Sequence, residues 1–274
     1  MLLQHARGAL SLSPPVVMGV LNVTPDSFSD GGRFLDPALA VEQALRMAAE
    51  GASIIDVGGE STRPGAAAVD PDEELRRVIP VVAALAARTS LLISVDTSRP
   101  EVMERAIAAG AGMINDVRAL RAPGALAAVA RSGAAACLMH MRGEPTTMQQ
   151  LADYGDVVAA VRDLLAARLA ACADAGIDAG RLCIDPGFGF AKRTEHNLEL
   201  LRRLRELRVL GPPLLVGLSR KSMLQGLTGR APQDRLAGSV ALATVAVLNG
   251  ASIVRAHDVA ATVDAVRVAA ALIH

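Results

Sequence analysis

Aromatic residues are scarce in this chain of 274 residues, which has no tryptophan, one tyrosine and four phenylalanines. Its core must therefore be built from Ala, Val, Leu and Ile, and a hydrophobic content of 51% is enough for a large core. All four phenylalanines lie in glycine-rich segments rather than in apolar runs; they are Phe28, Phe34, Phe188 and Phe190. Two interpretations of them stay open, loop packing and contact with a flat ligand.

The chain also lacks an excess of either charge, since 28 basic and 28 acidic residues give a formal net charge of zero. The basic residues are scattered, which argues against a nucleic acid or a membrane surface as partner and favours small-molecule substrates. The longest apolar runs, such as 78–87 and 240–248, are far shorter than the roughly 20 residues of a membrane span. Residues 1–15 contain no apolar segment typical of a signal peptide, so we expect a cytoplasmic protein.

Cysteine is rare and is not arranged for a disulfide or a zinc site. The three cysteines are Cys137, Cys172 and Cys183, an odd number without Cys-x-x-Cys spacing. Two of them lie in apolar runs. The pattern therefore predicts buried free thiols.

Short β-type runs alternate with longer helical patterns along the whole chain. The runs are 16–21, 53–57, 91–95, 112–114, 135–139, 182–184, 214–217 and 252–254. Eight strand–helix units predict an α/β fold, a (β/α)8 TIM barrel in a single domain, with a doubly wound open sheet as the alternative. We expect the barrel over residues 16–274, after an N-terminal extension of residues 1–15 whose structure the sequence does not determine.

Capping and breaking residues mark the predicted helices. Asp70-Pro71, with Glu73 three residues after Asp70, is typical of a capping box that opens a helix. Pro80 is expected to kink or end that helix. Further helix starts are predicted at Pro100, Gly124, Asp156, Thr194, Asp234 and Asp258.

An unusually long connection follows the first predicted strand. It begins with the segment 22–32, Asn-Val-Thr-Pro-Asp-Ser-Phe-Ser-Asp-Gly-Gly, and extends to Asp36-Pro37, which is typical of a helix cap and first turn. Such links usually have about two to six residues. The sequence therefore predicts a lid or a binding loop.

Polar residues follow every predicted strand, at the end where a TIM barrel carries its active site. A turn explains any one of them equally well, but a closed barrel would bring all of them around a common mouth. One group could present donors and acceptors to a planar, nitrogen-rich ring, since a carboxylate accepts parallel hydrogen bonds from adjacent N–H groups. This group comprises Asp96, Asn115, Asp185 and Lys221. A second group is richer in donors and suits an anion; it comprises Asn22, Arg63, Arg255 and His257.

The chain has only two lysines, Lys192 and Lys221. We interpret Lys192 as a solvated surface charge, and Lys221, at a strand end, as a compact donor that could reach the ring. His140 and His196 have no partners at metal-ligand spacing and are interpreted as structural. A zinc site is disfavoured, whereas Mg²⁺ held mainly by phosphate and water stays compatible with the sequence.

Eight segments together form a specific signature. They are 22–32; 58–64 (Gly-Gly-Glu-Ser-Thr-Arg-Pro); 94–97 (Ser-Val-Asp-Thr); 114–117 (Ile-Asn-Asp-Val); 140–143 (His-Met-Arg-Gly) with Pro145, Met148 and Gln149; 185–190 (Asp-Pro-Gly-Phe-Gly-Phe); 219–222 (Ser-Arg-Lys-Ser); and 255–258 (Arg-Ala-His-Asp). Through them the chain resembles the bacterial dihydropteroate synthase family along nearly its whole length. The resemblance implies a homodimeric TIM barrel that joins 6-hydroxymethyl-7,8-dihydropterin diphosphate to 4-aminobenzoate. Diphosphate and 7,8-dihydropteroate are released for folate synthesis, and the family is the target of sulfonamides.

The resemblance also implies roles for particular residues. The pterin ring would be held by Asp96, Asn115, Asp185 and Lys221, with Arg255 over its face. The diphosphate would be surrounded by Asn22, Arg63, Arg255 and His257, with Mg²⁺ contacted by Asn22 and, when the first loop closes, by Asp30. The 4-aminobenzoate pocket would be lined by Phe28, Thr62, Pro64, Phe190, Lys221 and Ser222.

The reaction expected on this basis is a dissociative substitution at the pterin methylene carbon, with Lys221, Arg255 and His257 as the catalytic residues. Two alternatives are kept. A pterin-dependent methyltransferase would share the ring carboxylates but would not need the anion-binding group. A non-catalytic paralogue would bind pterin without synthesis.

Overall fold

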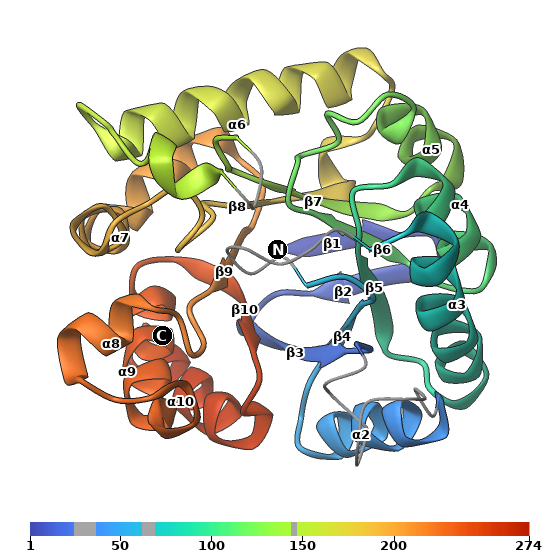
Figure 1. The fold of residues 1–274 in the computed structure, drawn as a ribbon, viewed down its shortest axis with the longest axis horizontal. Helices are drawn as coiled ribbons and strands as arrows, with labels where there is room; N and C mark the ends of the chain where they lie inside the picture. The colour runs from blue at the N-terminus through green and yellow to red at the C-terminus, as the bar shows by residue number, and fades with distance from the viewer. Residues whose placement is uncertain (25–36, 62–68, 144–146, 274) are drawn as a thin grey trace.

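The computed structural model describes residues 1–24, 37–61, 69–143 and 147–273, and eight parallel strands among them form a closed barrel (Figure 1). The strands are β3 (Val16–Asn22), β4 (Ile54–Gly58), β5 (Leu92–Asp96), β6 (Met113–Asp116), β7 (Ala135–Met139), β8 (Leu182–Asp185), β9 (Leu214–Gly217) and β10 (Ala251–Ala256). They follow one another in sequence order around the barrel, and β10 pairs with β3 to close it. The predicted TIM barrel is confirmed, and each predicted strand is found to within a few residues.

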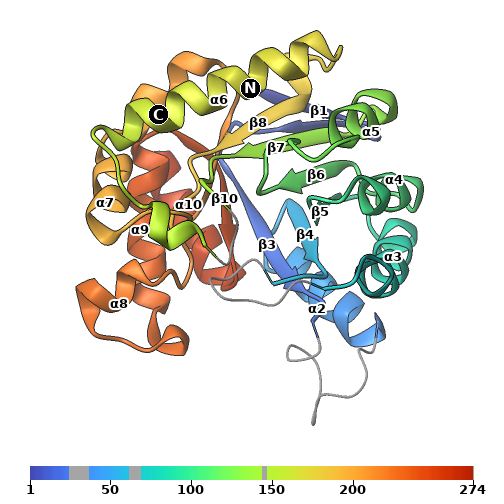
Figure 2. The ribbon, with the colours of Figure 1, turned by 45° about the horizontal axis from the view of Figure 1, so that its top comes forward.

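Helices surround the strands (Figure 1). They are α2 (Pro37–Ala49), α3 (Pro71–Arg88), α4 (Pro100–Ala108), α5 (Ala125–Ser132), α6 (Val157–Asp174), α7 (Thr194–Arg202), α8 (Met223–Thr228), α9 (Leu236–Leu248) and α10 (Val259–Ala271). In both views α3, α4 and α5 lie together on one side of the barrel, and α7 to α10 gather on the other (Figure 2). No helix in the described part of the chain is long and apolar enough to cross a membrane.

Most of the predicted helix starts are confirmed, and two expectations are corrected. The Asp70 side chain accepts a hydrogen bond from the backbone N–H of Asp72, 3.0 Å away, at the start of α3. Pro80 does not end α3, which continues to Arg88. Because Pro80 is exposed, the carbonyl that its missing N–H leaves without a helical partner can be hydrated. Near Asp234 a short 3₁₀ turn, Pro232–Asp234, comes first, and α9 begins at Leu236.

Side chains on alternate positions of each strand face the barrel interior or the helices, because successive residues of a strand point to opposite faces. Val17, Ile55 and Ile93 pack outward, in the large core shared with the helices. Met18, Ile54 and Leu92 belong to a separate cluster inside the barrel. The interior is therefore a packed second core at the N-terminal end of the strands.

The N-terminal extension closes that end of the barrel. It forms an antiparallel hairpin of β1 (Leu2–His5) and β2 (Gly8–Ser11), a structure that the sequence did not determine. Leu3 is wholly buried and Leu12 is nearly so, and both join the interior cluster. The hairpin thus supplies the floor of the barrel core.

The cysteines and phenylalanines can now be placed. Cys137, Cys172 and Cys183 are free and buried, as predicted. Phe188 is wholly buried in the main core, so its role is packing, whereas Phe190 lies in a small cluster with Met139 and Met141.

A substitution in the hairpin tests whether Leu3 belongs to the core at the floor of the barrel. Replacing Leu3 by Ala should lower the free energy of unfolding by about 2–5 kcal/mol, because it removes a buried side chain and leaves a cavity. Leu2→Ala is the matched control: Leu2 is 60% exposed, so its change should stay within about 0.5 kcal/mol. Urea unfolding of both variants measures the difference, and equal losses would show that Leu3 is not part of the core.

Candidate active site

The carboxyl ends of neighbouring strands bring the predicted rim residues to one mouth. In the parallel register Asn22 is opposite Gly58, Gly58 is opposite Asp96, and Asp96 is opposite Asn115. An added Cβ on Gly58 would lie 3.9 Å from Asn22 Oδ1, which places the amide oxygen of Asn22 beside this rim. Three predicted site residues, Asn22, Asp96 and Asn115, thus lie along one arc.

Arg255 lies inside the barrel between two buried carboxylates. Its Nε donates to Asp56 Oδ2 at 2.6 Å, and its Nη2 donates to Asp96 Oδ2 at 3.0 Å. The Nδ2 of Asn115 donates to the same oxygen of Asp56 at 3.0 Å. Three residues that were predicted on separate strands are therefore joined in one network, Asn115 and Arg255 through Asp56 and Asp96 through Arg255. The network thus links two members of the predicted ring group to one member of the predicted anion group.

Asp56 is a site residue that the sequence analysis missed. It is wholly buried on β4, two residues after Ile54 and therefore on the same inward face. Asp56 lies within the mostly apolar run 53–57, whereas the predicted site residues all follow the ends of such runs. The available signal was a carboxylate at an inward position of a strand, between Ile55 and Val57 in the sequence, which is unfavourable without a paired cation.

Burial and pairing shift the charges at this mouth. Burial raises the pKa of Asp96 to about 7, although the neighbouring Arg255 opposes the shift. Burial also raises the pKa of Asp185, opposed by the N–H of Gly187 and the Lys221 ammonium. Burial alone would lower the pKa of Arg255, but Asp56 and Asp96 hold it above its usual range, so the guanidinium stays charged.

Asp185 is held by the tight turn that follows it. The Gly187 N–H donates to Asp185 Oδ1 at 2.7 Å, and the His140 N–H donates to the Asp185 carbonyl at 2.9 Å. Gly187 has φ +70°, and an added Cβ would lie only 2.0 Å from the His140 carbonyl oxygen. Only glycine fits this position, so the sequence at 187 fixes the direction of the Asp185 carboxylate.

Lys221 points toward the same turn. Its Nζ lies 4.5 Å from the centroid of the Phe190 ring, and its side chain passes Gly189, where an added Cβ would lie 3.2 Å from Lys221 Cδ. Burial lowers the pKa of Lys221 to about 8, with Asp185 opposing the shift. The buried Arg235 fixes the backbone here by donating to the carbonyl oxygens of Arg220 and Lys221 at 3.0 and 3.3 Å. Ser222 is exposed, directly before α8.

His257, directly after β10, lies against the loop after β9. Its Nδ1 is 3.0 Å from Ser219 Oγ, and its backbone N–H donates to the same hydroxyl at 3.3 Å. His257 therefore joins the loops after β9 and β10, where TIM barrels frequently bind phosphate.

Five of the predicted contact residues lie outside the described residues; they are Phe28, Asp30, Thr62, Arg63 and Pro64. The predicted lid, whose residues 25–36 are also outside, stays a prediction. The expectation for Lys192 is wrong: its side chain is 3% exposed and hydrogen-bonded to buried acceptors rather than solvated.

The described residues contain no group of three or more His, Cys, Asp or Glu side chains that could hold a metal ion. Among the predicted metal contacts, only Asn22 can be placed, and it offers one neutral oxygen at the rim. A hard cation that keeps most of its water and phosphate ligands needs few protein oxygens. The amide oxygen of Asn22 is a ligand of the type that such a cation takes, and the other predicted contact, Asp30, lies outside the described residues.

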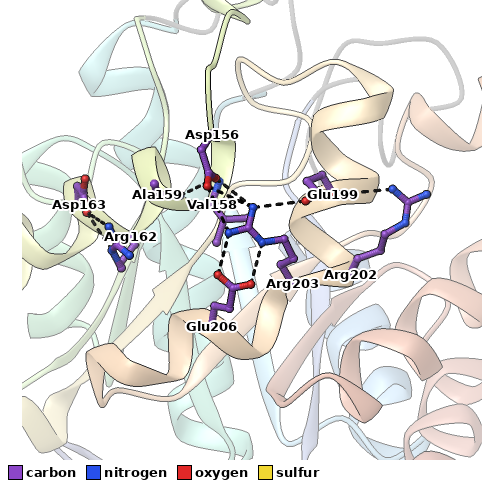
Figure 3. Close-up of polar contacts among 9 residues, drawn as sticks. All are labelled: Asp156, Val158, Ala159, Arg162, Asp163, Glu199, Arg202, Arg203 and Glu206. Atoms are coloured by element: carbon purple, nitrogen blue, oxygen red, sulfur yellow. Dashed lines mark hydrogen bonds and ion pairs between the residues drawn. The ribbon is translucent and has the colours of Figure 1, made fainter.

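A second charged cluster joins α6 and α7 (Figure 3). Arg203 donates to Glu206 at 2.8 Å and contacts Asp156 at 3.3 Å, and a hollow of about 520 Å³ lies beside it. These partners are exposed and paired with one another, so they contribute at most modestly to stability. The buried network around Arg255, rather than this exposed cluster, is therefore the candidate active site.

The comparisons with known proteins all indicate the same family. A model described as pterin binding enzyme matches residues 18–257. The dihydropteroate synthase of Escherichia coli strain K12 is 54% identical over 260 residues, which cover 95% of this chain and 92% of that protein. The Yersinia pestis dihydropteroate synthase in complex with a sulfonamide drug superposes with a TM-score of 0.95 at 49% identity, over 99% of both chains. The Xanthomonas albilineans enzyme in complex with 7,8-dihydropteroate gives a TM-score of 0.88 at 53% identity, over 96% of this chain and 95% of that chain.

The raised pKa of Asp96 predicts a pH dependence of stability. Between its ordinary value of 3.8 and about 7, the folded protein keeps a proton on Asp96 that the unfolded chain releases. The free energy of unfolding should therefore fall as pH rises through this window, by up to about 1.4 kcal/mol per pH unit from this group.

Urea unfolding of the native chain and of Asp96→Asn across this window measures that contribution as the difference between the two curves. Asp163→Asn is the control, because Asp163 is 68% exposed and its curve should run parallel to the native one. A parallel curve for Asp96→Asn as well would refute the shifted pKa.

Proposed function

The chain belongs to the dihydropteroate synthase family of pterin-binding enzymes, and on that basis we propose how the mouth of its barrel carries out the family's reaction. Enzymes of this family are transferases that join 6-hydroxymethyl-7,8-dihydropterin diphosphate to 4-aminobenzoate, releasing diphosphate and 7,8-dihydropteroate. The observation that carries the assignment of the site is the buried network of Arg255, Asp56, Asp96 and Asn115. It lies at the end of the barrel where this fold binds substrates.

The pterin ring is assigned to Asp96, Asn115, Asp185 and Lys221, with Arg255 over its face. Buried carboxylates accept strong, charge-assisted hydrogen bonds from adjacent N–H groups. In a dry pocket, leaving such a group unpaired costs about 1–3 kcal/mol, so a ring with the wrong donors is rejected. The fixed direction of the Asp185 carboxylate supports this assignment.

The diphosphate is assigned to Asn22, Arg63, Arg255 and His257, with Mg²⁺ contacted by Asn22 and Asp30. When bound, the ion neutralises negative charge on the departing diphosphate. The contact between His257 and Ser219 holds the imidazole at the loops after β9 and β10, and β9 is the direct neighbour of β8, which ends at Asp185. Arg255 keeps its positive charge and therefore attracts the negatively charged diphosphate inside the mouth.

The 4-aminobenzoate pocket is assigned to Phe28, Thr62, Pro64, Phe190, Lys221 and Ser222. Lys221 and Phe190 support this assignment, because an ammonium 4.5 Å from an aromatic ring presents both charge and an apolar face. A benzoate needs both features, since its carboxylate seeks a cation and its ring seeks an apolar contact.

The reaction we propose is a dissociative substitution at the pterin methylene carbon. The bond from this carbon to the diphosphate oxygen breaks, and its electron pair leaves with the diphosphate. Arg255 and His257 stabilise the charge that grows on the leaving group, while Asp96 and Asp185 stabilise the electron-poor ring. The amine of 4-aminobenzoate then forms the new carbon–nitrogen bond and releases a proton, so no side-chain nucleophile is required. Lys221 positions the incoming substrate.

We further propose a cytoplasmic homodimer. α9 and α10 pack side by side, and the outer surface that they and the end of the chain form exposes large apolar side chains, including Val245, Val268 and Leu272. Burial of this surface against a second copy would remove it from water. Size-exclusion chromatography with light scattering measures the oligomeric state.

The proposed activity predicts a three-component requirement. Purified protein should release diphosphate only when Mg²⁺, the pterin diphosphate and 4-aminobenzoate are present together, as measured by a coupled diphosphate assay. The two alternatives give other results: a methyltransferase would transfer a methyl group from methyltetrahydrofolate, and a non-catalytic paralogue would bind pterin without turnover. Absence of diphosphate release from folded protein would reject the synthase function.

The ring assignment predicts the behaviour of two variants. Asp185→Asn and Lys221→Ala should each weaken binding of the pterin diphosphate by about 30-fold or more, because truncating one partner of a buried, hydrogen-bonded charge pair costs about 2 kcal/mol or more. Isothermal titration calorimetry measures the affinity, with the exposed Asp163→Asn as a control that should bind like the native chain. Near-native affinity of either variant would refute its place at the ring.

A further inference from the structure

We propose that Lys192 is a positioning residue for 4-aminobenzoate: its buried ammonium holds the backbone of the 187–190 turn and thereby sets the place of the Phe190 ring. The proposal rests on the function proposed above for Phe190. It assigns a role to the second of the two lysines, which lies outside the set of residues that contact substrate.

The Lys192 ammonium has three acceptors, one for each of its N–H groups. Its Nζ lies 2.9 Å from His140 Nδ1, 2.9 Å from the Gly187 carbonyl oxygen and 3.0 Å from the Phe190 carbonyl oxygen. The side chain is 3% exposed and His140 is 1% exposed. The amine is therefore a central donor around which the turn closes.

The shape of the turn explains why a donor is needed there. Gly187, Gly189 and Ala191 all have positive φ, of +70°, +83° and +50°. This backbone directs the carbonyls of Gly187 and Phe190 toward the same nitrogen. The Gly187 carbonyl also accepts from the Phe190 N–H at 3.1 Å, so the Phe190 carbonyl is the one that relies on the ammonium. A buried carbonyl without a donor is strongly unfavourable, so the ammonium makes this conformation possible.

Other contacts hold the turn from outside, whereas Phe190 is held through its carbonyl by Lys192 and through its N–H by the Gly187 carbonyl. The Gly189 N–H donates to Asn197 Oδ1 at 2.8 Å, and Gln149 Nε2 donates to the Gly189 carbonyl at 2.9 Å. Asp185 is held by backbone N–H groups, those of His140 and Gly187, and makes no hydrogen bond to Lys192 itself among the contacts of the described residues. Of the two substrate-facing residues on this segment, Phe190 is thus the one whose carbonyl is bound by the ammonium.

The cost of burying Lys192 indicates that this residue does more than stabilise the fold. Burial lowers the pKa of Lys192 to about 7, with Asp185 opposing the shift and Lys221 adding to it. Burying a cation is unfavourable, and an apolar side chain of similar length would avoid that penalty. What an apolar side chain could not do is bind three acceptors and keep the ring of Phe190 against Lys221.

The test is a Lys192→Met variant, which keeps the length of the side chain and removes its donors. The KM for 4-aminobenzoate should rise about tenfold, while the affinity for pterin diphosphate measured by calorimetry should change less than about threefold. Amide hydrogen exchange at residues 187–190 should become faster, a readout that needs no catalytic activity. Arg202→Met is the control, because it removes an exposed cation from α7, and it should leave all three quantities unchanged.

A double variant shows whether Lys192 acts through Phe190. If it does, Lys192→Met combined with Phe190→Leu should have the same KM for 4-aminobenzoate as Phe190→Leu alone. Additive effects would overturn the proposal, as would a parallel loss of pterin affinity in Lys192→Met or a KM within threefold of the native value. Should Lys192→Met not fold, Lys192→Arg replaces it. This variant keeps the charge but cannot direct three N–H groups from one atom, and the same outcomes decide.

The same experiments distinguish a failure of the proposed synthase function from a failure of the role proposed for Lys192. In that case the native protein itself releases no diphosphate in the presence of 4-aminobenzoate, whereas hydrogen exchange still reports whether Lys192 holds the turn. Unchanged exchange at residues 187–190 in a folded Lys192 variant would overturn the positioning role whatever the activity.

Discussion

A guanidinium placed inside a barrel must be matched by carboxylates, and in this chain Arg255 meets Asp56 and Asp96 there. Removing one partner from a buried ion pair leaves an uncompensated charge and typically costs about 3–5 kcal/mol. The three residues come from β10, β4 and β5, so their pairing requires the barrel to be closed with the correct strand register. The same carboxylates are also held without full hydration, which is the state in which they bind a ring with N–H donors most strongly.

The barrel interior therefore has two levels with different tasks. The lower level is apolar, formed by residues such as Met18, Ile54 and Leu92 and closed by the hairpin. The upper level is polar and begins two residues further along β4 and β5, at Asp56 and Ser94. Because alternate residues share a face, a shift of one residue in any strand would exchange inward and outward side chains and destroy both levels. The packed floor thus fixes the position of the polar residues above it.

Much of this arrangement could be predicted from the sequence, because apolar runs and the residues that follow them encode strands and strand ends. The buried partners were harder to find. Asp56 is hidden within a strand, and its importance depends on Arg255, which is 199 residues away in the sequence. Lys192 follows a glycine-rich turn and precedes Arg193, which is typical of a surface segment. Only the left-handed backbone at positions 187, 189 and 191 turns the carbonyls inward and makes a buried amine favourable there. The floor was not predictable either, since two short strands of four residues have little periodicity of their own.

The N-terminal hairpin also has a consequence for how the chain reaches its folded state. Leu3 is synthesised well before β9 and β10, yet the cluster that buries it includes Leu215 and Ile253 from these two strands. The surface that receives the hairpin is complete only after those strands have joined the barrel. Contacts between such distant parts of a chain form slowly, because the intervening segment must first be ordered. The residues of the hairpin are thus among the last to be buried, although they precede the barrel in the chain, and their burial reports that the barrel has closed.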